Sequence, residues 1–289
     1  MSDLTKTENW PRISIITPSF NQAAFLERTM RSVLDQNYPN LEYIVIDGGS
    51  TDDSVEILKK YDCRLAYWIS EKDHGQSHAL NKGLERATGD VVGWLNSDDL
   101  YCPGTLLHVG EWFATHPQDE VHYGGLYLID ADDCLTDAHW AAPPDVRYTY
   151  FVAMDVHQQS LFWRRDLMER AGKIDESFRF SMDLDFVLRL MLHGRVSRTK
   201  RYLGMFREHE AAKTSNIADI CLHENQIIFE RYREFFPTNI PSRWLKSWLS
   251  LRRTASVLWE APLSYSAFKV GHRAGLPVRA DWLIEKHNA

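Results

Sequence analysis

The sequence of 289 residues has few cysteines, no long apolar run and no leader pattern at its start, and each shortage excludes a class of protein. The four cysteines, at positions 63, 102, 134 and 221, form no C-x-x-C pair, so we expect free thiols in a reducing compartment. No stretch approaches the roughly 18 apolar residues of a membrane span. Residues 1–10 are polar and carry both charge signs, unlike a signal peptide. These absences predict a cytoplasmic protein.

Positive charge is also scarce. The chain has 33 Lys and Arg against 40 Asp and Glu, a net charge of −7, which argues against a nucleic acid as partner of the whole chain. The charges are unevenly spread, because residues 230–289 hold 10 basic and 5 acidic side chains, whereas residues 1–229 hold 23 and 35. The acidic part suggests functional carboxylates, and the basic end suggests contact with an anionic surface.

What the sequence does contain is a regular alternation of strand and helix patterns in its first half. The expected strands are 13–17, 41–47, 65–70 and 91–95. The expected helices begin near Asn21, which is the expected cap of the first one, and near Asp52 or Asp53, Gln76 and Pro103. Short links between them are typical of a parallel sheet with helices on both faces, so we expect an α/β fold.

Polar residues gather where these strands are expected to end. The ends carry Thr17-Pro18-Ser19, Asp47-Gly48-Gly49, Ser70-Glu71-Lys72-Asp73 and Ser97-Asp98-Asp99. Because ligands of open α/β sheets bind beyond the carboxyl ends of the strands, we expect the functional site there.

The second half of the sequence is less regular. We expect a strand at 121–130, a loop-rich stretch at 131–150, a helix at 183–192, a strand at 196–206, and helices at 217–236 and 242–259.

The first strand is not followed by a glycine-rich phosphate loop. Neither G-x-G-x-x-G nor a Walker A segment is present, so a divalent cation held by carboxylates is the better candidate for neutralising a diphosphate. The Asp98-Asp99 pair at a strand end suits this role, with Mn²⁺ or Mg²⁺ as the ion. The alternative role for the pair is to cap the helix expected near residue 103.

Several segments match a known family in order and spacing. They are Ile15–Asn21, Ser32–Gln36, Glu42–Asp52, Asn81-Lys82-Gly83 and Leu95–Asp99. With these motifs the chain resembles glycosyltransferase family 2, the inverting nucleotide-sugar transferases of the GT-A fold. The resemblance is dense over about the first 105 residues and patchy over the next 110.

The resemblance implies a division of the chain and a GT-A fold, with a mostly parallel central sheet, helices on both faces and a helical carboxyl-terminal extension. The expected parts are a polar tail (1–11), a nucleotide-sugar-binding subdomain (12–125), an acceptor-binding and catalytic subdomain (126–240) and a basic helical extension (241–289).

The resemblance also implies roles for the strand-end residues. Thr17, Pro18 and Ser19 would wrap the nucleotide, and Asp47 would read its base or ribose, unless it only caps the next helix. In the metal motif Ser97-Asp98-Asp99, Asp98 would contact the ribose and Asp99 would hold the metal.

Asp73 and Lys82 match positions near the nucleotide and its phosphates, although an exposed turn and an exposed helix residue are the simpler roles. Many family members have Arg immediately before the Asn of the Asn81 motif, and here that residue is Leu80. This departure removes one expected phosphate partner.

The segment Ser181–Phe186 resembles the one that holds the family's catalytic base, usually the second residue of a Glu-Asp pair. Met182 replaces the Glu, so Asp183 is the predicted base that takes the proton of the acceptor hydroxyl. Asp185 is two residues away, so on a helix it points elsewhere and should be structural. The alternative is that both carboxylates complement the helix dipole.

Two further segments match family positions. In Phe206–Thr214, His209 would be a third metal ligand or a diphosphate contact, and Arg207 and Lys213 would balance phosphate charge. His157 and Gln158 match positions near the transferred sugar or the acceptor. A packed or solvated loop histidine is the alternative for His209.

The basic extension includes the amphipathic stretch 242–259, with Trp244, Trp248 and Trp259 on one stripe. Such a stripe fits peripheral contact with the inner face of the membrane, a helix packed on the protein body, or a homodimer interface. Packing on the body is the commonest of the three.

Together these features predict a metal-dependent inverting glycosyltransferase. It would move one sugar from a nucleotide sugar, most simply a UDP-sugar, to a hydroxyl of a glycan or lipid-linked acceptor in cell-surface glycan synthesis. A processive synthase is disfavoured because no Q-x-x-R-W segment is present. The alternatives are a nucleotidyltransferase and a non-catalytic sugar-nucleotide-binding or scaffold protein, which the Met182 departure keeps open.

Overall fold

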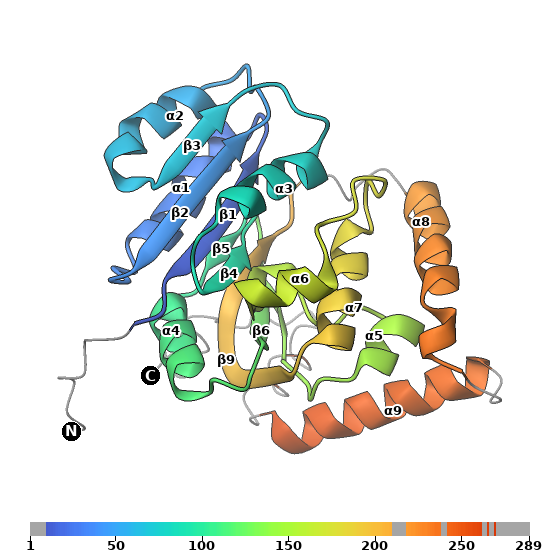
Figure 1. Ribbon diagram of the computed structural model, residues 1–289. Helices are drawn as coiled ribbons and strands as arrows, with labels where there is room; N and C mark the ends of the chain where they lie inside the picture. Colours follow the sequence, from blue (N-terminus) through green and yellow to red (C-terminus); the bar gives the residue numbers. More distant parts are fainter. Residues whose placement is uncertain (1–9, 210–217, 238–241, 262–264, 266–268, 270–289) are drawn as a thin grey trace, which may run out of the picture.

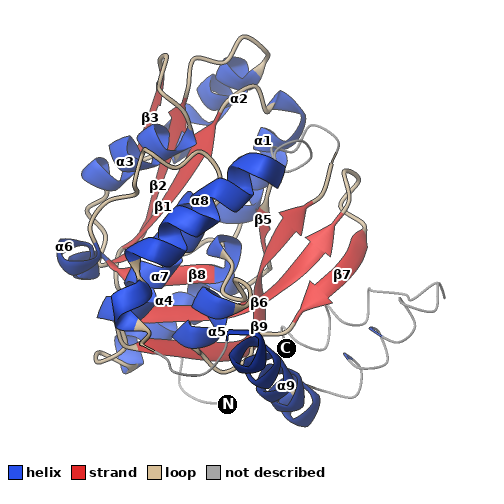
Figure 2. Ribbon diagram, turned by 90° about the vertical axis from the view of Figure 1, so that its right-hand side faces the viewer, coloured by secondary structure: helices blue, strands red, loops and turns tan. Residues whose placement is uncertain are grey.

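A computed structural model describes residues 10–209, 218–237 and 242–261, together with residues 265 and 269. Its centre is a nine-stranded sheet in the order β3-β2-β1-β4-β8-β6-β9-β5, with β7 paired to β6 (Figure 1). Helices cover the sheet on both faces and extend the molecule at its carboxyl-terminal side (Figure 2). The predicted α/β fold class is therefore confirmed.

The first half follows the predicted alternation closely. The strands are β1 (Ile13–Ser19), β2 (Leu41–Asp47), β3 (Tyr67–Ser70) and β4 (Val91–Trp94), and the helices are α1 (Ala23–Leu34), α2 (Ser54–Tyr61) and α3 (Gln76–Arg86). All pairings among these four strands are parallel.

The alternation of side chains along β1 and β2 explains why both faces are covered. Ile16, Ile44 and Ile46 pack with Leu80 of α3 in one core. Ile13, Ile15, Tyr43 and Val45 lie on the other face and pack with apolar residues of α1 and α2. Both faces of these strands are buried, which is why their sequences read as nearly continuous apolar runs.

The second half continues the sheet with strands of both directions. Its elements are β5 (Leu100–Tyr101), α4 (Thr105–Thr115), β6 (Val121–Ile129), β7 (Leu135–His139), α5 (Val146–Phe151), β8 (Leu161–Arg164), α6 (Met168–Ala171), α7 (Met182–His193) and β9 (Val196–Arg207). β6 pairs parallel with β9 and antiparallel with β7 and β8. The expected subdomain boundary at 125 and 126 falls inside β6, so the two subdomains share one sheet.

Two longer helices complete the described chain: α8 (Ala218–Arg231) and α9 (Ser242–Glu260). Leu245 and Leu249 of α9 are buried in the same core as Tyr150 and Phe151 of α5. Within the described residues, no helix combines the length and the apolar character needed to cross a bilayer.

Three local predictions differ from the structure. Asn21 does not cap α1, since it has a φ of +51° and its side-chain oxygen accepts a hydrogen bond from the Thr51 amide instead. α4 begins at Thr105 rather than at Pro103. The stretch expected to be loop-rich contains β7 and α5, because pairing with β6 and an N-cap at Asp145 stabilise them.

Candidate functional site

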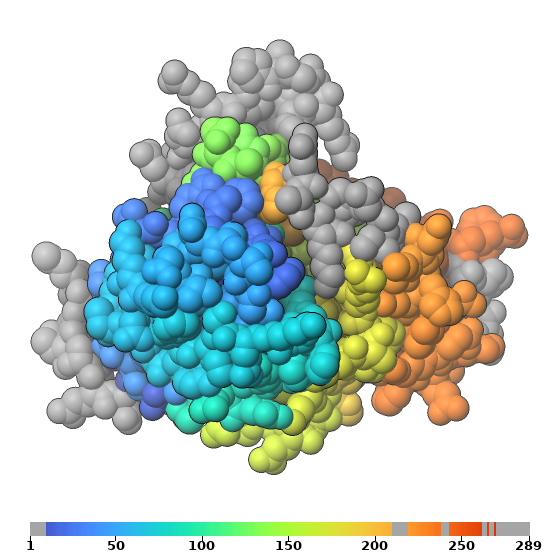
Figure 3. Space-filling model, turned by 90° about the horizontal axis from the view of Figure 1, so that it is seen from above, coloured from blue at the N-terminus to red at the C-terminus, as the bar shows by residue number. Residues whose placement is uncertain are grey.

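The carboxyl ends of β1, β2, β4 and β9 meet at one end of the sheet, which Figure 3 shows from above. The blue amino-terminal half and the yellow segment that leads into α7 lie next to each other on this face. The predicted site residues of the first half therefore gather there, as the parallel strands require.

Asp99 is the buried support of this site. Its Oδ1 accepts a hydrogen bond from the Arg207 backbone amide at 3.0 Å. Its Oδ2 accepts from Gln159 at 2.9 Å, from Asn96 at 3.2 Å and from Gln158 at 3.4 Å. Burial, and then the neighbouring Asp98 carboxylate, raise the pKa of Asp99 well above its usual value.

Asp98 has the opposite environment. Its side chain is 21% exposed, and its Oδ2 lies 3.2 Å from Nε2 of His209, whose side chain is 5% exposed. The His209 ring packs on Phe25 of α1 with 4.5 Å between ring centroids. A carboxylate and an imidazole are thus fixed side by side, from the β4–β5 turn and from the end of β9.

Arg207 ties these two segments together. Its Nε donates to the Asp98 carbonyl at 2.7 Å, its Nη1 donates to the Asp130 carbonyl at 2.9 Å, and it forms an ion pair with Asp133. Its side chain is fully buried and lies 5.0 Å over the Phe25 ring. The predicted phosphate cation therefore also has a clear structural role.

Three buried polar atoms around this end of the sheet have no hydrogen-bond partner within the described part of the chain. They are Ser19 Oγ, Gln158 Oε1 and Arg207 Nη2. A buried polar group without a partner costs free energy, so these atoms fit a site completed by a polar ligand.

Thr17 and Asp47 are built into the fold. Thr17 is fully buried and its hydroxyl lies 3.0 Å from the Tyr43 hydroxyl, away from a surface ligand. Asp47 accepts hydrogen bonds from the Ser50 amide at 2.9 Å and from the hydroxyls of Ser50 and Ser70 at 2.5 and 2.6 Å. Asp47 thereby fixes the loop that follows β2, and Pro18 is buried beside it within β1.

Asp73 and Lys82 lie near the same loop. A Cβ on Gly48 would be 2.7 Å from Oδ2 of Asp73, so the missing side chain leaves room for this carboxylate. Lys82 is only 23% exposed and pairs with Glu71. Lys213 lies outside the described residues.

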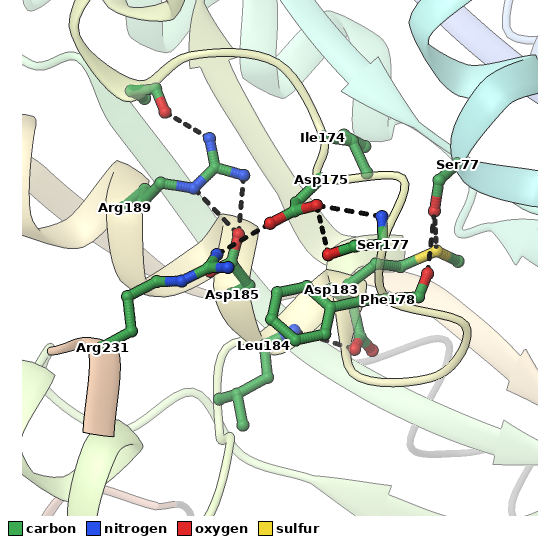
Figure 4. A network of polar contacts seen from close by, with 12 residues as sticks. Ser77, Ile174, Asp175, Ser177, Phe178, Asp183, Leu184, Asp185, Arg189 and Arg231 are labelled. Atoms are coloured by element: carbon green, nitrogen blue, oxygen red, sulfur yellow. Dashed lines mark hydrogen bonds and ion pairs between the residues drawn. The ribbon is translucent and has the colours of Figure 1, made fainter. Parts of the chain in front are cut away.

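Asp183 and Asp185 point in different directions from α7, as Figure 4 shows. Asp185 is fully buried and accepts from Arg189 at 2.8 Å, from Arg231 at 2.9 Å and from the Tyr232 hydroxyl at 2.7 Å. Asp183 is only partly buried and accepts from the Leu184 amide at 2.8 Å. The geometry thus gives Asp185 the structural role and leaves Asp183 closer to solvent.

A cavity of about 410 Å³ lies beside the start of α7. It is lined by Ser177, Phe178, Asp219, Ile220, His223, Glu224 and Ile227. The Glu224 carboxylate accepts from the backbone amides of residues 179, 180 and 181 at 2.7–2.8 Å, so the cavity wall also fixes the first turn of α7.

His157 and Gln158 precede β8. Nε2 of His157 lies 3.2 Å from Nδ1 of His139. Burial, and then His139 and Arg253, lower the pKa of His157 to about 3, so this imidazole is neutral near pH 7. Gln158 reaches Asp99, which places it at the candidate site.

Sequence analysis did not single out three residues that complete the site: Phe25, Asn96 and Gln159. Asn96 lies in the matched segment Leu95–Asp99 and donates to Asp99, three residues away. Phe25 and Gln159 contact partners distant in the chain, His209 and Asp99. Gly204 of β9 brings the Gln159 segment close, since a Cβ there would be 2.3 Å from the Gln159 carbonyl oxygen.

The described residues contain no group of three or more His, Cys, Asp and Glu side chains that could hold a metal. Two protein ligands are nevertheless enough for an ion that also binds substrate phosphates and water. Asp98 and His209 therefore fit a divalent cation on donor chemistry.

Solved structures show the class of fold. S. aureus TarS in complex with UDP-GlcNAc aligns with a TM-score of 0.62 and 17% identity, over 88% of this chain and 77% of that one. The mannosyltransferase PcManGT from Pyrobaculum calidifontis, in complex with GDP-Man and Mn²⁺, aligns with a TM-score of 0.56 and 18% identity, over 92% and 81%. The chain thus has the fold of GT-A glycosyltransferases.

Sequence relatives identify the family. Residues 14–132 match the model described as Glycosyl transferase family 2. An uncharacterized glycosyltransferase of Mycobacterium tuberculosis is 34% identical over 63% of this chain and 70% of its own length. The putative teichuronic acid biosynthesis glycosyltransferase TuaG of Bacillus subtilis is 45% identical over 48% and 57%. The chain belongs to glycosyltransferase family 2.

Proposed function

We propose that this protein is a metal-dependent inverting glycosyltransferase that moves one sugar from a nucleotide sugar to an acceptor hydroxyl. The observation that carries the proposal is the Asp98–His209 pair beside buried polar atoms without partners, at the ligand-binding end of a family 2 fold.

Asp98 and His209 are the proposed metal ligands. The sequence favoured Asp99 for this role, but both of its oxygens accept hydrogen bonds from protein donors and its side chain is buried. Asp99 instead fixes the turn that presents Asp98. When bound, the cation would neutralise the diphosphate and stabilise it as a leaving group.

The donor is proposed to lie along the ends of β1 and β2. Ser19 and Asp73 face this region, and Arg207 offers Nη2 to a phosphate oxygen. Asp47 and Thr17 would act by holding the loop and strand in place. A UDP-sugar is the proposed donor class, since a fold neighbour binds UDP-GlcNAc, although another binds GDP-Man.

Asp183 is the proposed base that accepts the proton of the acceptor hydroxyl. Its partner on the helix, Asp185, is held by two arginines and a tyrosine and would not be free to take a proton. The neighbouring cavity, with Phe178, Ile220 and Ile227 in its wall, would admit part of the acceptor.

The acceptor is proposed to be a cell-surface glycan, or a lipid-linked precursor of one, as the name of TuaG suggests. We also propose a cytoplasmic location with peripheral contact to the inner face of the membrane.

Calorimetric titration with UDP, GDP and dTDP, in Mn²⁺, in Mg²⁺ and in chelator, tests the donor site. We expect one diphosphate to bind only with metal, and the loss of that binding in Asp98→Asn. Absence of binding to all three by folded protein would exclude the proposed site. Binding without turnover of any donor sugar would favour the non-catalytic alternative that Met182 raises.

A further inference from the structure

The outward face of α9 is a continuous apolar stripe. Its members are Trp244, Trp248, Leu251, Leu258 and Trp259, which are 51–89% exposed. At about 100° per residue they share one side of the helix. Leu245 and Leu249 point the other way and are buried against the body. The helix therefore does pack on the body, but through a different face from the tryptophan stripe.

Exposed tryptophan is otherwise absent from the described residues. Trp94, Trp140 and Trp163 are buried, and Trp10, Trp68 and Trp112 are partly buried. On one face of α9, by contrast, three tryptophan side chains are each more than half exposed. Indole rings prefer the boundary between water and the lipid headgroups, where the apolar ring and the polar N–H are both accommodated.

The charges around the stripe indicate which partner covers it. Arg243 and Lys246 are exposed and pair with no acidic side chain in the part of the chain that is described, and Arg243 lies over the Trp244 ring. Arg252 and Arg253 pair with Asp145 and Asp155 of the body. Glu260, the only acidic residue of α9, pairs with Arg198. Only Arg243 of the two unpaired cations lies beside the stripe, because Lys246 is about 200° from Trp244 around the helix, so the free charge next to the stripe is positive.

This charge disfavours a second copy as the partner, because a symmetric contact through the stripe would bring like charges together. An anionic lipid surface supplies both an apolar layer for the indoles and phosphates for the cations. We propose that α9 docks the protein on an anionic phospholipid bilayer, lying in the interface with its tryptophan stripe inserted.

Figure 1 shows α9 at the opposite end of the molecule from the carboxyl ends of β1 and β2. Docking through α9 would thus leave the candidate site facing away from the lipid. The part of an acceptor that enters the site would then be the end that projects farthest from the bilayer, rather than the part next to the lipid headgroup.

Sedimentation of the full chain with vesicles tests the proposal, using pure phosphatidylcholine or a mixture with phosphatidylglycerol. We expect binding to the anionic vesicles only. The triple variant W244S/W248S/L251S should weaken it by about tenfold or more, since each tenfold change is about 1.4 kcal/mol. R243E, which changes the unpaired cation over the Trp244 ring, should weaken it and reduce the preference for anionic lipid. L222S/F235S, which changes exposed apolar residues outside α9, is the matched control.

Thermal denaturation should be unchanged in the α9 variants, because the substituted side chains point to solvent. Failure of the wild-type chain to bind anionic vesicles would overturn the proposal. So would full binding by the triple variant, or a dimer in light scattering that the triple variant abolishes. Because no nucleotide is present, none of these outcomes bears on the proposed sugar transfer.

Discussion

Asp98 and Asp99 are adjacent in sequence, yet the fold gives them different chemical environments. Asp99 points inward to donors from Asn96, Gln159 and the Arg207 backbone, whereas Asp98 points toward His209 and the solvent. At the residue scale, the two carboxylates of this motif therefore have different roles: Asp98 is a proposed metal ligand, and Asp99 supports the turn that holds it.

Substitution separates the two roles. Asp98→Asn should abolish metal-dependent UDP binding while changing the free energy of unfolding by no more than about 0.5 kcal/mol. Asp99→Asn should lower it by about 1–3 kcal/mol, because the new amide group faces protein donors. Calorimetry and urea denaturation measure the two effects. The two roles would be reversed if a stable Asp99→Asn protein lost metal-dependent UDP binding while Asp98→Asn kept it.

The second pair of carboxylates, on α7, divides in the same way. Asp183→Asn should reduce turnover by about 100-fold or more, with UDP binding unchanged. Asp185→Asn should instead lower the free energy of unfolding by about 3 kcal/mol, since it breaks buried ion pairs with Arg189 and Arg231. Kinetics with a donor identified by calorimetry, and urea denaturation, check the two results. Normal turnover in Asp183→Asn would rule it out as the base.

At the scale of elements, the junction of α4 with β6 contains a cluster of buried imidazoles. The His108 and His122 Nε2 atoms are 3.2 Å apart, and Trp112 stacks between His116 and His122. Burial, and then repulsion from the Arg201 guanidinium, lower the pKa of His108 to about 4. Burial, and then the repulsion that a protonated His108 would exert, lower the pKa of His122 to about 2. Both rings are therefore neutral in the folded protein near pH 7.

This cluster should make the fold sensitive to acid. Below pH 6.5, the ordinary histidine value, the unfolded chain takes up protons that the folded protein excludes, so stability falls as pH falls from 6.5 toward 4. Each such proton contributes about 1.4 kcal/mol per pH unit. His122→Asn should flatten the dependence of the unfolding free energy on pH in this window. The exposed His74→Asn is the control, and an unchanged slope in His122→Asn would contradict the prediction.

At the scale of the whole molecule, the candidate site depends on segments from both halves of the chain. Asp98 follows β4, His209 follows β9, and Gln158 and Gln159 precede β8. The single sheet holds them in register, and Thr29 of α1 donates to the carbonyls of Ser97 and Asp99 at 2.9 and 2.8 Å. A ligand bound here would bridge these segments.

Such a ligand should stabilise the entire fold. UDP and Mn²⁺ together, at about 100 times the dissociation constant, should add about 2.7 kcal/mol to the free energy of unfolding. This corresponds to a rise in Tm of about 4–5 °C for a chain of this size. Either component alone should raise Tm much less, and chelator should cancel the effect. Equal shifts with and without metal would argue against a metal-bridged diphosphate.

Sequence alone determined the α/β class, the first four strands and the end of the sheet at which the polar residues of the candidate site gather. Local patterns suffice for these features. Apolar runs predict the strands, the alternation with helices predicts that the strands are parallel, and the polar residues after each run mark the strand ends. The motif residue Asn81, by contrast, is explained only by a tertiary contact, because its amide exchanges hydrogen bonds of 2.9 and 3.0 Å with the backbone of Ile174, which is distant in the chain.

Only the tertiary structure decided which carboxylate of each pair faces solvent and which face of α9 remains uncovered. Asp99 is buried because Arg207 and Gln159, distant in the chain, converge on it. The tryptophan stripe is exposed because α9 packs on the protein body through another face, with Leu245 and Leu249 buried in the core. Side-chain burial depends on contacts between segments that are remote in sequence, and a local pattern holds no information on which of two neighbouring residues those contacts will enclose.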